Sequence, residues 1–186
     1  MKLDLLKHSL EAAPIVRLGS YDYFVHPITD GIPSMPPKLL KEVLDAMVEV
    51  GDFSCDLITT PEAMGIPLAV PLSLRLGIPY NVIRKRRYSL PGEVQVHQVT
   101  GYSEKELFIN GIKAGDRVVL VDDVLSTGGT LRAVVQALQN TGVELVDVIV
   151  VVEKGRNKSK LENELGLRIK TLVKVEVREG RLVVLS

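Results

Sequence analysis

The sequence predicts an α/β protein with a mostly parallel, twisted sheet flanked by helices. Strand-like apolar runs alternate with helix-like segments from residue 55 onward, and the runs at 117–123 and 144–153 are almost continuously apolar. Strands of this kind are buried on both faces, so helices must cover both sides of a parallel sheet. The 186 residues favour a single domain, 1–186.

The N-terminal part is predicted to hold two helices separated by less regular chain. Residues 2–12 show an amphipathic pattern, whereas 14–37 contains many Pro and Gly residues, which favour irregular or short extended structure. In 36–50, apolar residues recur at helical spacing. Pro stands at the start of that segment and Gly51 just past its end, as helix termini prefer.

The rest of the chain alternates, with one interruption. We expect strands and helices in turn at 55–60, 62–76, 79–84, 117–123, 129–140, 144–153 and 158–165. A terminal hairpin is expected from 168–177 and 181–186, turning at Glu179–Gly180. Residues 84–108 interrupt the pattern with charges, Pro and Gly, and so long a connection is typical of a working loop or lid.

Composition argues against several classes of protein. Lys+Arg and Asp+Glu number 23 each, and zero net charge argues against a general nucleic-acid or membrane-surface binder. There is no signal-peptide pattern, and no apolar run approaches the roughly 20 residues of a membrane span. The single cysteine, Cys55, fits a reducing compartment and is expected to be a buried small apolar residue. We therefore expect a cytoplasmic protein with no nucleic-acid or membrane partner.

The segment RVVLVDDVLSTGGTL, residues 117–131, contains the most informative pattern. Asp122 and Asp123 end an apolar strand, and ligands of open parallel sheets bind at the carboxyl ends of strands. The following small residues lead into a helix, whose N-terminal N–H groups favour a phosphate, and glycines let the backbone approach it closely. Thr127 and Thr130 add hydroxyl donors. The combination suits a ribose 5-phosphate, because the carboxylates can accept from sugar hydroxyls.

Other interpretations of this segment fit less well. A P-loop would read GxxxxGK[ST], which the chain lacks, and a dinucleotide fingerprint places its acid about twenty residues after the glycines. Here the acids come before the turn. The run VVLVDD alone could belong to an ATPase, and the acids alone could be a polar strand end before a capped helix.

The stretch VVLVDDVLSTGGT resembles the phosphoribosyl-pyrophosphate (PRPP) motif of type I phosphoribosyltransferases, and the resemblance extends over nearly the whole chain. It is strongest for the archaeal-type hypoxanthine/guanine group, itself similar to adenine and xanthine phosphoribosyltransferases. This implies the fold of that family, a homodimer, and Mg2+ held mainly by PRPP rather than by protein ligands. It also implies that Asp122 and Asp123 bind the ribose 2′- and 3′-hydroxyls as catalytic residues. The 5-phosphate would be bound by Ser126, Thr127, Gly128, Gly129 and Thr130.

Two further segments resemble pyrophosphate-binding parts of the family. TTPEAMGIP, residues 59–67, resembles the pyrophosphate loop, although it could be a plain capped turn. IRKRRYSLPGE, residues 83–93, resembles the start of the flexible loop of adenine enzymes, where a basic residue reaches the neighbouring subunit's pyrophosphate; a solvated charge run is the alternative. Arginine suits phosphate because it donates two-point hydrogen bonds. The implied pyrophosphate-binding residues are Glu62, Ala63, Met64, Gly65, Arg84, Lys85, Arg86 and Arg87.

The stretch YDYFVHPITDGI resembles the hood that covers the base, here residues 1–35, and is similar to both xanthine and adenine enzymes. Lys154, just after an apolar strand, could reach a purine O6, or it could be a surface lysine. Phe24 could instead be a core residue. The implied base-binding residues are Phe24, Val25, His26, Thr29 and Lys154.

The proton acceptor is not assigned. Adenine enzymes carry a glutamate on the returning half of the flexible loop, and Gly101 aligns with that position. Glu104 is offset from it, and His97 is a weaker candidate. The three histidines are scattered along the chain and suggest no transition-metal site.

The reaction implied is transfer of the 5-phosphoribosyl group from PRPP to hypoxanthine or guanine, giving IMP or GMP and pyrophosphate. Adenine phosphoribosyltransferase, giving AMP, remains an alternative because the basic loop resembles the adenine enzymes. An orotate-type enzyme and a PRPP-sensing transcription regulator are further alternatives. The first 20 residues are too short for a winged-helix DNA-binding segment, and the intact loop favours an enzyme.

Overall fold

The computed structural model of the chain describes residues 2–19, 21–99 and 104–185. Its centre is a six-stranded sheet in the order β10-β9-β8-β7-β3-β4, in which only β10 runs antiparallel to its neighbour. The strands are β3 (Leu57–Pro61), β4 (Tyr80–Ile83), β7 (Arg117–Leu125), β8 (Glu144–Lys154), β9 (Lys170–Arg178) and β10 (Arg181–Val184). This confirms the predicted α/β class with a mostly parallel sheet.

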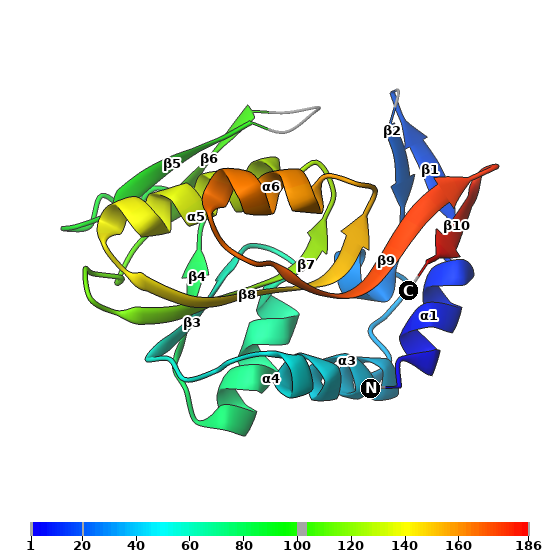
Figure 1. Cartoon of the computed structure of the whole chain (residues 1–186), viewed down its shortest axis with the longest axis horizontal. Helices are drawn as coiled ribbons and strands as arrows, with labels where there is room; N and C mark the ends of the chain where they lie inside the picture. The colour runs from blue at the N-terminus through cyan, green and yellow to red at the C-terminus, as the bar shows by residue number, and fades with distance from the viewer. Residues whose placement is uncertain (1, 20, 100–103, 186) are drawn as a thin grey trace.

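Helices cover both faces of the sheet, as Figure 1 shows. One face carries α3 (Pro37–Val50) and α4 (Ile66–Leu76), and the other carries α5 (Gly129–Thr141) and α6 (Lys158–Leu165). Along β7, Val119 and Val121 pack in the core on the α3 side, whereas Val118 and Leu120 pack on the α5 side. Successive side chains of a strand point to opposite faces, so the almost continuously apolar sequence follows from burial on both.

The N-terminal helix α1 (Asp4–Glu11) is attached to α3 and to the edge of the sheet. The backbone N–H groups of Leu5 and Leu6 donate to the Glu42 carboxylate of α3 at 3.2 and 2.8 Å. Leu6 and Leu10 are fully buried. This attachment fixes where the chain enters the hairpin that follows.

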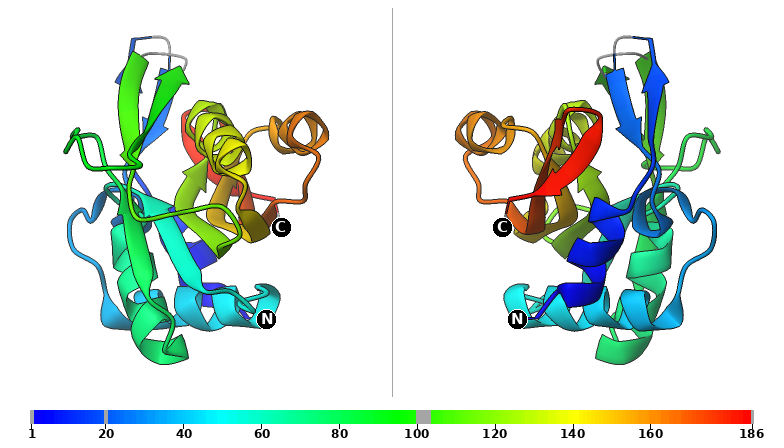
Figure 2. Two further views of the ribbon diagram at one scale, coloured as in Figure 1. Left: turned by 90° about the vertical axis from the view of Figure 1, so that its left-hand side faces the viewer. Right: turned by 90° about the vertical axis from the view of Figure 1, so that its right-hand side faces the viewer.

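That hairpin consists of β1 (Ile15–Leu18) and β2 (Tyr21–Phe24), paired antiparallel, and is followed by the short helix α2 (Pro27–Asp30). It forms the short extended structure expected within 14–37. Figure 2 shows the hairpin and a second two-stranded ribbon rising from the same side of the molecule.

The second ribbon lies within 84–108 and consists of β5 (Val94–Val99) and β6 (Glu104–Ile109). An irregular loop was expected here, but Val96, Leu107 and Ile109 are buried in the core beside α5. These apolar residues stand among charged ones, which hid the strand pattern in the sequence. Residues 100–103, including Gly101, lie outside the described part of the chain, and the flexibility of the segment stays a prediction.

Smaller differences concern element ends and one side chain. Helix α4 begins at Ile66 rather than near residue 62, because a turn precedes it. The terminal hairpin turns as predicted at Glu179 and Gly180, both with positive φ (51° and 73°). Cys55 is half-buried rather than fully buried.

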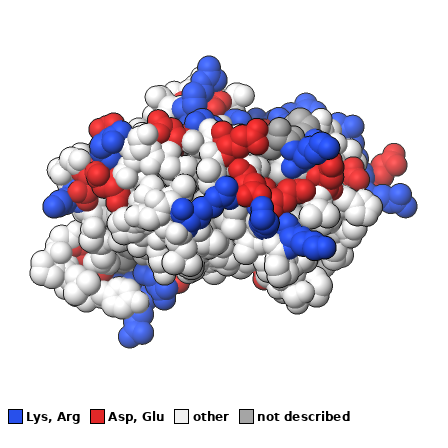
Figure 3. Space-filling view, turned by 90° about the horizontal axis from the view of Figure 1, so that it is seen from below, with Lys and Arg blue, Asp and Glu red and all other residues white. Residues whose placement is uncertain are grey.

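The surface has no dominant charge on the face seen in Figure 3, where basic and acidic side chains are interspersed. Asp45 of α3, for example, forms ion pairs with Lys41 at 2.6 Å and with Arg75 of α4 at 2.5 Å. Among the described residues, none of the helices combines the length and the apolar content that a membrane crossing requires.

Candidate active site

Two adjacent carboxyl groups, Asp122 and Asp123, lie near the carboxyl end of β7. They are only 8% and 9% exposed, and the strand continues past them to Leu125. The N–H of Asp123 donates to Asp122 Oδ1 at 2.9 Å. Burial raises the pKa of Asp122 to about 6. Burial, the neighbouring Asp122 and then Asp30 also raise the pKa of Asp123 well above its usual range. The pair therefore favours a ligand that supplies hydrogen-bond donors or positive charge.

A turn of small residues, 126–130, follows β7 and leads into α5; we call it the cradle, because phosphate binding was predicted for it. Gly128 has a positive φ of 81°, and a Cβ there would lie 3.1 Å from Leu161 of α6, so glycine suits both the backbone and the space. The N-cap residue of α5 is Gly128, which has no side chain with which to cap the helix. Its first N–H groups and dipole therefore offer an anion site beside the two carboxyls.

The cradle is held from both sides. On one side, the Ser126 carbonyl accepts from Asn157 Nδ2 at 3.1 Å. On the other, the Ser126 hydroxyl lies 2.6 Å from the Tyr21 hydroxyl of β2. Neither Asn157 nor Tyr21 was identified from the sequence, since no motif links them to Ser126.

The turn after β3 presents backbone amides, as predicted for 62–65, but not all of them are available. The N–H of Glu62 donates to the Ile83 carbonyl at 3.0 Å, which leaves Ala63, Met64 and Gly65. A Cβ on Gly65 would lie 1.7 Å from Thr60 Oγ1, so only glycine fits there.

The basic run, residues 84–87, contains one side chain that pairs with Glu62 and three that are exposed. Arg84 forms an ion pair with Glu62 at 3.4 Å, and the N–H of Lys85 donates to the same carboxylate. The side chains of Lys85, Arg86 and Arg87 are exposed. Of the four basic side chains, that of Arg84 pairs with the 62–65 turn of its own chain, and Lys85 is tied to the same turn through its backbone.

The hood residues are mostly occupied by contacts within the protein. His26 is fully buried, with Nε2 2.9 Å from Ser9 Oγ, and its Nδ1 accepts from the N–H of Ile28 at 3.2 Å. Burial lowers its pKa to about 4, so the ring is neutral. The Thr29 hydroxyl donates to Asp30 at 2.6 Å. Phe24 is 4% exposed and belongs to the core, and Val25 is half-buried. The side chains of His26 and Thr29 are thus engaged elsewhere than with a base.

Asp30 was not selected from the sequence, although it organises the hood. Its carboxylate accepts from the Tyr23 hydroxyl at 2.6 Å, from the His26 N–H at 3.0 Å and from Thr29. Asp30 ends α2, which contacts β7, and its charge contributes to the raised pKa of Asp123. In the sequence, the only sign of this role is that Asp30 follows His26, the N-cap of α2, by four residues.

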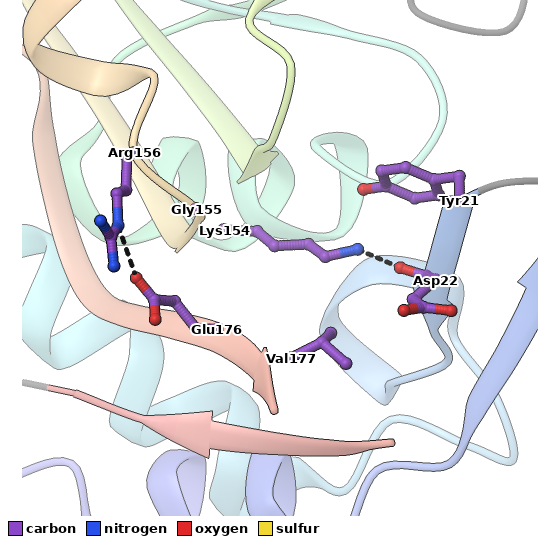
Figure 4. A pocket seen from close by; sticks show the side chains of 7 residues that line it. All are labelled: Tyr21, Asp22, Lys154, Gly155, Arg156, Glu176 and Val177. Carbon is purple, nitrogen blue, oxygen red and sulfur yellow. Dashed lines mark hydrogen bonds and ion pairs between the residues drawn. The ribbon is translucent and has the colours of Figure 1, made fainter. Parts of the chain in front are cut away.

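Lys154 lies where the sheet meets the hood. It is the last residue of β8, its ammonium donates to the Asp22 carbonyl, and Nζ lies 3.8 Å from the Tyr21 ring centroid and 5.8 Å from that of Phe24. Figure 4 shows this side chain extending toward Asp22. The Arg156–Glu176 ion pair lies on the opposite side of the same cavity. The cavity measures about 420 Å³ and is lined by Tyr21, Asp22, Lys154, Gly155, Arg156, Glu176 and Val177.

The acid/base candidates gain no support. His97 is exposed on β5, opposite Glu106. Gly101 and the side chain of Glu104 lie outside the described part of the structure.

Residues 38–177 match the family described as the phosphoribosyl transferase domain. The chain therefore belongs to the phosphoribosyl transferase family, which confirms the family predicted from VVLVDDVLSTGGT. Over nearly its full length it is similar to proteins named hypoxanthine/guanine phosphoribosyltransferase. The one from Methanohalophilus mahii is 53% identical over 99% of this chain and 96% of its own. The one from Methanocaldococcus jannaschii is 50% identical over 97% and 100%.

Solved structures share the fold. Adenine phosphoribosyltransferase from Thermoanaerobacter pseudethanolicus matches with a TM-score of 0.72 and 23% identity, covering 93% of this chain and 99% of that one. The enzyme from Leishmania tarentolae matches with a TM-score of 0.75 and 20% identity, covering 94% and 88%. At these identities the likeness concerns the fold alone.

Proposed function

We propose that the chain transfers the 5-phosphoribosyl group from PRPP to hypoxanthine or guanine, giving IMP or GMP and pyrophosphate. One observation carries this proposal: the buried Asp122–Asp123 pair lies beside the N-terminus of α5, whose N-cap is a glycine. Carboxylate acceptors for sugar hydroxyls and amide donors for a 5-phosphate thus occur together. The names of the relatives at 50–53% identity support the same conclusion.

Lys154 supports a 6-oxopurine as the base. An ammonium group can only donate hydrogen bonds. O6 of hypoxanthine or guanine accepts them, whereas the 6-amino group of adenine is itself a donor. Since Lys154 is held at the hood by Tyr21 and Asp22, it disfavours adenine in this cavity.

Different residues would perform different tasks in the substitution at the anomeric carbon. The carboxyl pair and the cradle fix the sugar phosphate in position, and the carboxylates place negative charge near an oxocarbenium-like transition state. The amides of Ala63, Met64 and Gly65, together with the basic run, offset the charge of the departing pyrophosphate. Closure of 84–108 over the site would exclude water from the activated sugar.

The site suits an Mg2+ ion whose ligands come mainly from PRPP rather than from protein side chains. The described residues contain no cluster of three metal-ligating side chains. The two buried carboxylates nevertheless supply the oxygen donors that Mg2+ prefers, and this ion commonly keeps substrate oxygens and waters as ligands. Asp122 and Asp123 would therefore face the ion as PRPP carries it in, and the ion would neutralise pyrophosphate charge.

We also propose a homodimer in which the basic run serves the partner's site. The side chains of Lys85, Arg86 and Arg87 are exposed, and Arg86 stacks on Tyr88 with its guanidinium 5.8 Å from the ring. Exposed cations at the start of the 84–108 segment are placed to reach beyond their own chain.

Pyrophosphate release, measured with PRPP, Mg2+ and each of five bases, tests the function. We expect turnover with hypoxanthine and guanine, and a kcat/KM at least about 100-fold lower with adenine, because Lys154 would face a donor. Xanthine and orotate complete the set. Turnover mainly with adenine would establish the adenine enzyme instead. PRPP binding without turnover of any base would indicate a regulator.

A further inference from the structure

Tyr21 of the hood touches both parts of the proposed substrate site. Its hydroxyl lies 2.6 Å from Ser126 Oγ in the cradle, and its ring centroid lies 3.8 Å from Lys154 Nζ. We infer that Tyr21 is a positioning residue that orients the Ser126 hydroxyl toward the 5-phosphate and holds Lys154 for the base. The inference rests on the proposed function and adds a residue that couples its two binding sites.

The hydroxyl contact has a preferred direction when phosphate is bound. A hydroxyl donates one hydrogen bond and accepts up to two. If Tyr21 donates to Ser126, the hydrogen of Ser126 remains available for an anionic phosphate oxygen. The reverse direction would present a lone pair of Ser126 to the phosphate and repel it. A phenol is also the stronger donor of the two groups, which favours the productive direction.

The backbone of Ser126 is held by other contacts, so Tyr21 acts on the direction in which the Ser126 hydroxyl donates. Its carbonyl accepts from Asn157, and the neighbouring Gly128 packs against Leu161. The Ser126 side chain is half-buried and so still accessible to a ligand.

The ring of Tyr21 acts on the base side. A cation within about 6 Å of an aromatic centroid is attracted to the ring face, and the Asp22 carbonyl accepts one of the three hydrogens of Lys154. The ammonium is thereby held at the cavity with hydrogens left for a base. Because one side chain fixes both groups, 5-phosphate binding and base binding should strengthen each other equally.

Calorimetric titration with ribose 5-phosphate tests the hydroxyl contact. We expect Tyr21→Phe to weaken binding about fivefold, the effect of one lost neutral hydrogen bond. Ser126→Ala should weaken it at least as much, and the double variant no further than Ser126→Ala alone, because both changes remove one interaction. Tyr23→Phe is the matched control, since that hydroxyl donates to Asp30; its affinity should stay within about twofold.

Tyr21→Leu tests the ring contact. This variant should weaken ribose 5-phosphate binding as Tyr21→Phe does, and it should also raise the KM for hypoxanthine, which Tyr21→Phe should leave near the wild-type value. Wild-type affinity in Tyr21→Phe, full additivity with Ser126→Ala, or a lowered Tm without loss of affinity would each overturn the inference. Failure of the wild-type protein to bind ribose 5-phosphate would instead contradict the proposed function itself.

Discussion

Asp122 and Asp123 are buried, although burying ionisable carboxyl groups lowers the stability of the fold. Burial raises the pKa of both carboxyl groups, and the neighbouring Asp122 raises the pKa of Asp123 further. Each ionised carboxylate destabilises the free protein. Under the proposed function, binding of the ribose hydroxyls and of the accompanying cation would relieve that cost, so the carboxyl pair would exchange folding stability for ligand affinity.

Replacing Asp122 by Asn should therefore stabilise the protein at high pH and inactivate it. The pKa of Asp122 is raised in the folded state from its ordinary value of 3.8 to about 6. Its stabilising contribution is thus complete below pH 3.8 and is lost as pH rises through about 6. Asn does not titrate, so we expect it to gain up to about 3 kcal/mol over wild type at pH 8.

Urea unfolding at pH 8 and pH 4.5 measures this difference. The gain should be much smaller at pH 4.5, whereas kcat should fall at least about 100-fold at pH 8 because the sugar loses an acceptor. An equal stability difference at both pH values would show that Asp122 does not titrate as described. Asp45, an exposed carboxylate with ion-pair partners, supplies the matched Asn control, which should gain nothing at pH 8.

Local sequence position indicated the edge of the sheet where the candidate residues lie. Asp122 lies near the carboxyl end of β7 and Lys154 ends β8, and parallel strands bring such ends to one edge. Tyr21 and Asn157 contact Ser126 through the tertiary fold, so no local pattern marks them. His26 matches the hood motif in sequence, but its ring turns inward to cap α2, which only the packing around Ser9 reveals.

At the scale of elements, the turn between β3 and α4 depends on one small residue. Gly65 has an ordinary φ of −71°, so its requirement is space and not backbone conformation. The obstructing atom is Thr60 Oγ1, which is fully buried at the end of β3. The amides proposed to bind pyrophosphate are therefore positioned by packing of the turn against its own strand.

Gly65→Ala should displace this turn. We expect a lowered Tm and, in the remaining folded protein, weaker pyrophosphate binding by about tenfold or more, because a displaced amide loses its hydrogen bond. The double variant Thr60→Ala/Gly65→Ala removes the obstructing oxygen and should recover part of both losses. Thr60→Ala alone controls for the loss of the hydroxyl. Unchanged pyrophosphate affinity in Gly65→Ala would argue against this turn as the binding element.

Element prediction was accurate for the sheet and poorer for the two ribbons. The strands β7 and β8 have long apolar runs that leave little ambiguity. Within 84–108, valines alternate with uncharged polar residues and a histidine along β5, whereas β6 begins with three charged residues before its apolar end. A short strand of that kind is easily taken for a loop when Pro and Gly flank it.

The whole molecule consists of a PRPP-binding body and a hood with separate sequence character. The family match begins at residue 38, so β1, β2 and α2 lie outside it. The hood nevertheless meets the body at the Tyr21–Ser126 and Asp22–Lys154 contacts. The contact between Tyr21 and Ser126 therefore joins a residue outside the family match to a residue inside it.

The proposed dimer predicts that two inactive variants can restore activity when they assemble with each other. Asp123→Ala removes a ribose acceptor, and replacing Lys85, Arg86 and Arg87 by alanine removes exposed cations without touching the core. Each variant alone should be inactive. If the basic run serves the partner's site, co-refolding the two should restore activity, since a mixed dimer holds one site with intact acids and a basic run from the other chain. Mixtures that stay inactive, although sedimentation shows dimers, would place the basic run at the site of its own chain.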